Sequence, residues 1–337
     1  MKGLFPILIV ATALLAGGGE ACRTAQFDPA SKVESVRILA TRSDKPYAKP
    51  GDTVSMEVLA SDDRADKTVP MKIWWVPLPC VDPPNDSYYG CYPGFAQLPA
   101  GVDLAPVLHA GTTFSFTMPT DVITKHTKRS GSVDAVPDGL AVIFTIACAG
   151  HVEYVPEKVG GSPNAMPLGC FDADHVALGP DDYVFAFSLV YAFDQRTNAN
   201  PVITQLTFGG TPVDPNLGIT VDHCGSAAAD VNGAVNRGNC PRTGMDVVVP
   251  DASWEDNPAD LDVNGKARKE EIRVQYFATD GKFANDTINL FDATAGRITG
   301  TSDDFTAPAL PGENTIWAIV RDDRGGATWL SIPLHVK

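Results

Sequence analysis

Alternation of hydrophobic and polar residues with a period of two dominates the chain after its first 30 residues. Val54, Met56 and Val58 fall on one face of the segment TVSMEVLASD. Ser55 and Glu57, which alternate with them, fall on the other face. The preceding residues Pro-Gly-Asp are typical of a turn, so this pattern predicts a half-buried β-strand.

The same pattern recurs along the chain. It predicts strands at residues 36–40, 73–76, 113–118, 140–148, 183–193, 202–208, 245–249, 272–278 and 287–291. Residues 140–148 and 183–193 are apolar at nearly every position, as expected of central strands with two buried faces. The chain ends in a predicted hairpin, NTIWAIVRDDRGGATWLSIPLHV, with its turn at residues 323–326.

Segments with the 3.6-residue period of a helix are almost absent after residue 30. Strands separated by turn residues, without helices between them, predict an all-β fold of antiparallel sandwiches. The polar stretch 194–201 divides the predicted strands into two sets. We therefore expect two domains, residues 35–196 and 197–337.

Each half resembles a bacterial immunoglobulin-like domain. The resemblance rests on the extended opening strand, the turn before the second strand, the tryptophan-bearing segment KIWW and the closing hairpin. It implies two immunoglobulin-like β-sandwiches, the first enlarged by insertions at residues 79–110 and 149–182. Long loops on a rigid scaffold are where binding residues concentrate.

The N-terminus predicts export. Met1-Lys2-Gly3 is followed by an apolar run, residues 4–16, and then by small residues. A positive start, a short apolar segment and a small-residue neck are the signature of a secretory signal peptide, here residues 1–21. No later segment is long and apolar enough to span a bilayer.

Seven cysteines leave one unpaired in an oxidising compartment. The segment LLAGGGEAC resembles the lipobox of bacterial lipoproteins, which implies that Cys22 carries a lipid and that residues 22–34 form a lipidated tether. In lipoproteins that stay at the inner membrane, an aspartate follows the lipidated cysteine. Arg23 stands at this position, so the resemblance implies the outer membrane of a Gram-negative bacterium. Ordinary cleavage after Ala21 is the alternative.

The other six cysteines form three near pairs: Cys80 with Cys91, Cys148 with Cys170, and Cys224 with Cys240. Proximity favours these pairs as disulfides, although six cysteines allow fifteen connectivities. Each closure would stabilise its loop by roughly 3 kcal/mol in the chain-entropy model.

Charge and missing motifs limit the function. The formal net charge of −15 argues against binding nucleic acid, which needs basic patches. No nucleophile elbow, zincin helix, phosphate-binding loop or dinucleotide fingerprint occurs in the sequence. A hydrolase with carboxylates on separate strands would escape this search.

Residues 260–271, DLDVNGKARKEE, match the spacing of a calcium-binding loop. Asp260, Asp262, Asn264 and Glu271 supply hard oxygen ligands at that spacing. Against this interpretation, no helix flanks the loop, so a solvated turn before the strand 272–278 is the alternative. A bound calcium ion would be structural, and we expect no other cofactor.

A second polar group surrounds Cys148 and Cys170. His151, Glu153, Asp172, Asp174 and His175 could ligate zinc or position a general base, and the alternative is a polar surface loop. The remaining histidines, at positions 109, 126, 223 and 335, are isolated in the sequence.

The insertion CVDPPNDSYYGCYPGF contains Tyr88, Tyr89, Tyr92 and Phe95. Exposed aromatic residues on a rigid loop suit recognition of a protein or a glycan, whereas the alternative is that they cover an edge of the first sandwich. Together these features predict an outer-membrane lipoprotein of the cell envelope with a structural or binding role and no catalytic activity. The alternative is a secreted hydrolase or carbohydrate-active protein that uses the loop carboxylates and histidines of the first domain.

Overall fold

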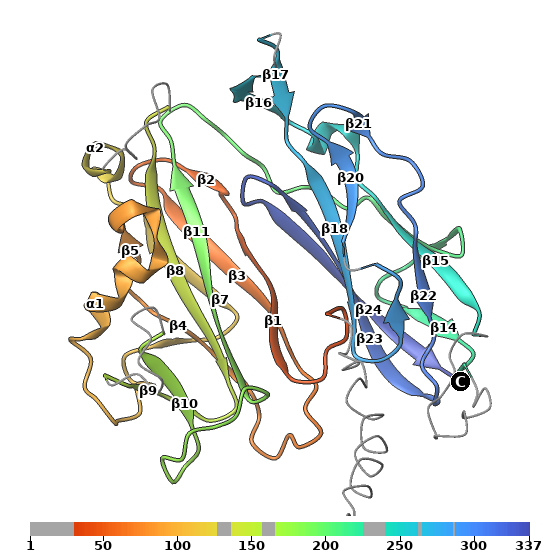
Figure 1. Ribbon diagram of the computed structural model, residues 1–337, viewed down its shortest axis with the longest axis horizontal. Helices are drawn as coiled ribbons and strands as arrows, with labels where there is room; N and C mark the ends of the chain where they lie inside the picture. The colour runs from red at the N-terminus through yellow and green to blue at the C-terminus, as the bar shows by residue number, and fades with distance from the viewer. Residues whose placement is uncertain (1–29, 127–135, 157–165, 225–239, 262–264, 286) are drawn as a thin grey trace, which may run out of the picture.

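The computed structural model describes residues 30–126, 136–156, 166–224, 240–261, 265–285 and 287–337, with the backbone alone for residues 257–261. The predicted signal peptide and Cys22 lie outside the described residues. The described chain is mostly β-structure arranged as two sandwiches, which confirms the predicted fold class (Figure 1).

The first sandwich pairs a three-stranded sheet with a six-stranded one. The smaller sheet has the order β1 (Val36–Ser43), β3 (Thr53–Asp62), β7 (Thr113–Thr117). The larger sheet has the order β2 (Tyr47–Ala48), β11 (Tyr183–Ala192), β8 (Gly139–Cys148), β4 (Lys72–Trp75), β6 (His109–Ala110), with β5 (Cys80–Val81) also paired to β8. Between the sheets, Met56, Trp75 and Ile143 are among the buried core residues.

The insertions of the first domain contain short elements of their own. They are η1 (Pro84–Asp86), η2 (Tyr88–Cys91), α1 (Tyr92–Phe95), and the antiparallel hairpin β9 (His151–Tyr154) and β10 (Leu168–Phe171). A single helical turn, α2 (Val122–Lys125), precedes β8. The β9–β10 hairpin was not predicted, because its strands are short and lie among glycine and proline residues.

The second sandwich pairs a five-stranded sheet with a six-stranded one. The first has the order β13 (Thr211–Val213), β12 (Gln205–Phe208), β15 (Arg242–Val248), β22 (Asp303–Thr306), β19 (Lys282–Phe283). The second has the order β14 (Ile219–Val221), β24 (Ala327–Val336), β23 (Gly312–Asp322), β18 (Ile272–Ala278), β20 (Ile288–Asp292), β21 (Gly296–Arg297). The short helix η4 (Asp251–Ser253) and the hairpin β16 (Asp256–Leu261) and β17 (Ala267–Lys269) complete the domain.

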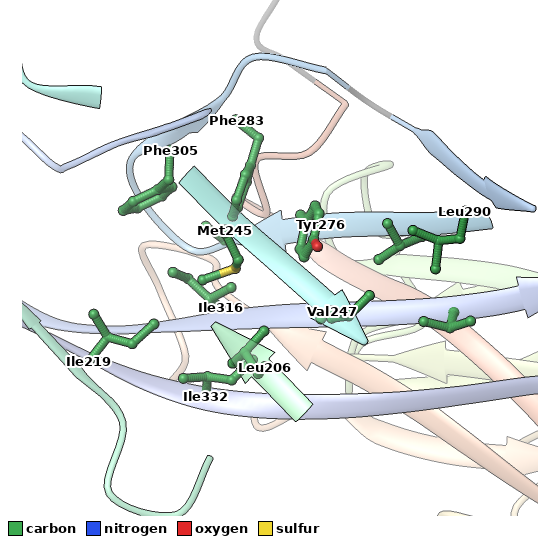
Figure 2. Close-up of a cluster of buried hydrophobic side chains, with 14 of the residues drawn as sticks. Leu206, Ile219, Met245, Val247, Tyr276, Phe283, Leu290, Phe305, Ile316 and Ile332 are labelled. Atoms are coloured by element: carbon green, nitrogen blue, oxygen red, sulfur yellow. The ribbon is translucent and has the colours of Figure 1, made fainter. Parts of the chain in front are cut away.

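The core of the second domain lies between its two sheets. Figure 2 shows Leu206, Met245 and Val247 from the five-stranded sheet facing Tyr276, Ile316 and Ile332 from the six-stranded sheet. In the first domain, Val54, Met56 and Val58, which alternation predicted on one face of their strand, are likewise buried between the sheets. The predicted C-terminal hairpin is present as β23 and β24, and its turn lies at the predicted residues.

The two sandwiches pack against each other through β1 and the outer face of β23. Leu39 and Ala40 from the first domain form one buried cluster with Trp317 and Ile319 from the second. Val33, which is fully buried in the same cluster, donates its backbone N–H to the carbonyl of Ala278 at 2.9 Å. Residues 31–33, which were predicted as part of the tether, are instead bound to the second domain.

All three predicted cysteine pairs are joined as disulfides, with Cα–Cα distances of 5.7 Å for Cys80–Cys91, 5.9 Å for Cys148–Cys170 and 5.4 Å for Cys224–Cys240. Disulfides are typical of proteins exported from the cytoplasm. Among the described residues, none of the helices combines the length and hydrophobicity that a membrane crossing requires.

Candidate functional site

The insertion at residues 79–110, which the disulfide Cys80–Cys91 closes, covers the outer face of β8. Leu140, Val142 and Phe144 point away from the sandwich core and pack against the disulfide Cys80–Cys91 and Phe95. This second cluster explains why every residue of β8 is buried although only one face meets the opposite sheet. Phe95 is only 5% exposed, so the prediction that it belongs to a binding surface is wrong: it fills this cluster.

The insertion leaves part of the neighbouring strand β11 uncovered. Phe187 lies opposite Phe144 and Leu189 lies opposite Val142, so both belong to the outer face of the sheet. Phe187 is 42% exposed and Leu189 is 36% exposed. The expectation that β11 is buried on both faces is therefore wrong at these two positions, because the insertion reaches β8 but does not close over β11.

Two tyrosines of the insertion border these residues. The ring centroids of Tyr88 and Phe187 lie 4.0 Å apart in a stacked arrangement, and those of Tyr88 and Tyr89 are also 4.0 Å apart. Tyr89 is 38% exposed. We call Tyr88, Tyr89, Phe187 and Leu189 the aromatic strip. Tyr92 is half-buried behind it and contacts Tyr88 and Tyr89 edge-on.

Tyr88 and Tyr92 stay uncharged at neutral pH. Burial raises the pKa of Tyr92 to about 12, and the pKa of Tyr88 is raised chiefly by its hydrogen bond with Tyr89. Neutral phenols offer both a donor and an acceptor beside an apolar ring. The aromatic strip therefore combines ring faces with hydrogen-bonding groups.

A histidine that appears isolated in the sequence holds the insertion in place. His126 has only 6% of its side chain exposed, its Nδ1 lies 2.8 Å from Oδ1 of Asp82, and its Nε2 lies 3.3 Å from Oδ1 of Asp86. Asp82 and Asp86, together with Asn85, adopt the left-handed backbone conformation. Such residues are strained unless their surroundings hold them, so His126 helps to fix the loop that carries the tyrosines.

A cavity of about 570 Å³ adjoins the aromatic strip at Leu189 and lies between the two domains. Tyr47, Arg42, Arg321 and Arg273 are among its lining residues. Burial, followed by the charge of Arg273, lowers the pKa of Arg321, although a guanidinium remains protonated at any physiological pH. The cavity thus places guanidinium donors next to an apolar surface.

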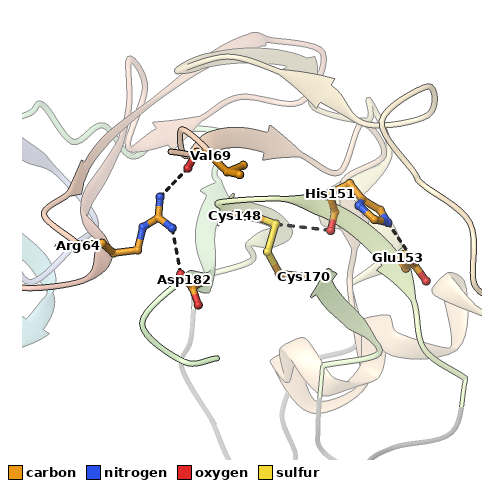
Figure 3. The surroundings of a disulfide bond; sticks show 7 residues. All are labelled: Arg64, Val69, Cys148, His151, Glu153, Cys170 and Asp182. Atoms are coloured by element: carbon orange, nitrogen blue, oxygen red, sulfur yellow. Dashed lines mark hydrogen bonds and ion pairs between the residues drawn. A yellow bond between two sulfur atoms is a disulfide. The ribbon is translucent and has the colours of Figure 1, made fainter. Parts of the chain in front are cut away.

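Of the five polar residues predicted near Cys148 and Cys170, His151, Glu153 and His175 come together. Glu153 Oε1 lies 2.7 Å from Nε2 of His151 and 2.6 Å from Nδ1 of His175. Asp172 faces the backbone instead, where it accepts the N–H groups of Asp174 and Val176. Figure 3 shows the ring of His151 turned toward Glu153, beside the disulfide Cys148–Cys170.

The predicted calcium loop is only partly within the described residues. The side chain of Asp260, and both Asp262 and Asn264, lie outside them. The backbone N–H of Glu271 donates to Oδ1 of Asp323 at 3.3 Å, just before β18 begins. Calcium binding by this loop stays a prediction.

No protein-family model matches the chain, and no curated protein matches its sequence. Among solved structures, the fibronectin(III)-like modules of Clostridium thermocellum CbhA align over 88% of this chain and 94% of their own, with 11% identity and a TM-score of 0.22. Dimeric latent PorU from Porphyromonas gingivalis aligns over 91% of this chain and 24% of its own, with 13% identity and a TM-score of 0.20. SGBP-B of the Bacteroides ovatus mixed-linkage glucan utilization locus, in complex with a heptasaccharide, aligns over 93% of this chain and 71% of its own, with 10% identity and a TM-score of 0.14.

Proposed function

We propose that this protein is an exported binding protein of the cell envelope whose first domain recognises a protein or glycan partner through the aromatic strip. The main support for the proposal is that Phe187 and Leu189 are exposed on β11, whereas the neighbouring strand β8 is fully buried. Aromatic residues held on a rigid sheet bind with little loss of conformational entropy, and they dominate many interfaces.

The chemistry of the surroundings supports recognition. The strip offers apolar rings, tyrosine hydroxyl groups and, in the adjoining cavity, guanidinium donors. A specific interface typically surrounds aromatic anchors with polar groups that fix orientation. We do not propose the alternative hydrolase function, because the carboxylate of Asp172 accepts backbone N–H groups of its own turn instead of joining Glu153.

Substitution of the strip tests this proposal. The double variant Tyr89→Ala and Phe187→Ala should lower partner capture at least tenfold, because loss of a central aromatic contact typically costs about 2 kcal/mol or more. Capture is measured by crosslinking in intact cells and by binding to a glycan array. Leu217→Ala is the matched control, since Leu217 is an apolar residue of the second domain with 75% exposure. Equal capture by both variants would reject the strip as the binding surface.

We further propose that a lipid on Cys22 anchors the protein at the outer membrane. The support is the lipobox-like segment and the odd number of cysteines, of which six are paired in disulfides. The intact mass of natively expressed, detergent-extracted protein should show a lipid-sized excess on a chain that begins at Cys22. An unmodified mass with a reactive seventh thiol would contradict the anchor.

A further inference from the structure

Three side chains of metal-ligating type meet at the β9–β10 hairpin of the first domain. One potential ligand atom from each of His151, Glu153 and His175 lies within 4.8 Å of the other two. Among the described residues, this is the one place where three histidine, cysteine, aspartate or glutamate side chains approach so closely. The group is separate from the aromatic strip and takes no part in the proposed binding function.

Glu153 is the centre of the group. Its side chain is 5% exposed, and the hydrogen-bond and ion-pair partners of its carboxylate within the described residues are the two imidazole rings, with no lysine or arginine among them. A buried carboxylate is costly without a compensating positive charge. Neutral imidazoles compensate it only by hydrogen bonding, whereas a bound cation would compensate its charge.

The backbone holds the three side chains before any ligand binds. His151 and Glu153 are two residues apart on β9 and therefore point to the same face of the hairpin. The disulfide Cys148–Cys170 joins β10 to the end of β8. His175 follows β10 in a turn closed by Asp172, and it adopts a left-handed φ of +62°. Strain of this kind at a non-glycine residue is characteristic of functional positions.

We infer that His151, Glu153 and His175 form a zinc-binding site with three protein ligands and one position open to solvent. His151 would bind through Nε2, His175 through Nδ1 and Glu153 through its carboxylate. Zinc–ligand distances of about 2.0–2.2 Å at tetrahedral angles place donor atoms about 3.3 Å apart. The present nitrogen–oxygen distances of 2.6 and 2.7 Å are those of hydrogen bonds, so each must lengthen by about 0.6 to 0.7 Å to reach that spacing.

Each imidazole must present a lone pair to the metal, so the ring nitrogen that faces Glu153 cannot carry a proton when zinc is bound. Two imidazoles and one carboxylate suit zinc or a neighbouring transition metal, whereas calcium prefers oxygen ligands alone. His175 is 59% exposed at its side chain, which leaves the fourth position accessible to water or to a group from a partner.

Calorimetry with zinc chloride tests the inference. The full mature chain is used without a histidine tag, with Cys22 lipidated or alkylated, after dialysis against a chelator. We expect one equivalent of zinc per chain. His175→Ala and Glu153→Gln should each lower the affinity at least tenfold, since even loss of an outer-shell partner typically has that effect.

His335→Ala is the matched control, because His335 also contacts a glutamate, Glu313, at 2.6 Å, and the residues that the structure describes bring no third ligand to this pair. It should bind zinc as the unmodified chain does. His175 is largely exposed, so its variant should fold even if Glu153→Gln does not. Absence of zinc binding, or equal affinity in His175→Ala and His335→Ala, would overturn the inference.

Discussion

At the scale of single residues, the turn of the C-terminal hairpin contains a buried ion pair. Arg324 donates from Nε to Oε2 of Glu270 at 2.8 Å, and Glu270 is completely buried. Next to it, Asp322 accepts the side-chain amide of Asn198 at 3.0 Å. These contacts bind the junction between the domains to the hairpin turn. The sequence predicted the turn but not the contacts.

Burial raises the pKa of Glu270 to about 7, in spite of its hydrogen bonds with the backbone of Glu255 and with Arg324. The folded state therefore keeps a proton that the unfolded state loses near pH 4.5. It follows that this group stabilises the protein fully below about pH 4.5, and that its contribution falls as pH rises toward 7.

We predict that Glu270→Gln removes this pH dependence. The difference in free energy of unfolding between the unmodified chain and the variant should change by up to about 1.4 kcal/mol per pH unit between pH 4.5 and 7. Urea unfolding across this range measures the difference, and other titrating groups cancel in the comparison. A difference that stays constant with pH would contradict the raised pKa.

At the scale of elements, the alternation of apolar and polar residues predicted those strands whose burial follows from their own sequence. Residues 272–278 were predicted as a strand and form β18 with the same bounds. The complete burial of β8 also agrees with its continuous apolar sequence. The disulfide pairs could be predicted because the two cysteines of each pair are close in the sequence.

The strand β11 marks the limit of such predictions. Its apolar sequence closely resembles that of β8, yet Phe187 and Leu189 are exposed. Their exposure depends on where an insertion about 100 residues earlier in the chain ends, and no local pattern contains that information. For the same reason the sequence placed Phe95 at the surface and treated His126 as isolated, because their partners come from distant segments.

At the scale of the whole molecule, two sandwiches pack against each other, and the first contains the features that point to binding. The second domain supports the first through the buried cluster of Leu39, Ala40, Trp317 and Ile319. The cavity between the domains opens beside the aromatic strip. The aromatic strip therefore lies at the edge of the interface between the two domains.

Site-specific photocrosslinking in living cells tests the central claim most directly. A photoreactive amino acid is placed at position 187 in one protein and at position 217 in another, both on exposed side chains. The account predicts a crosslinked adduct with an envelope protein or glycan from position 187 and none from position 217. Adducts from neither position, or equally from both, would contradict the claim that the aromatic strip is the binding surface.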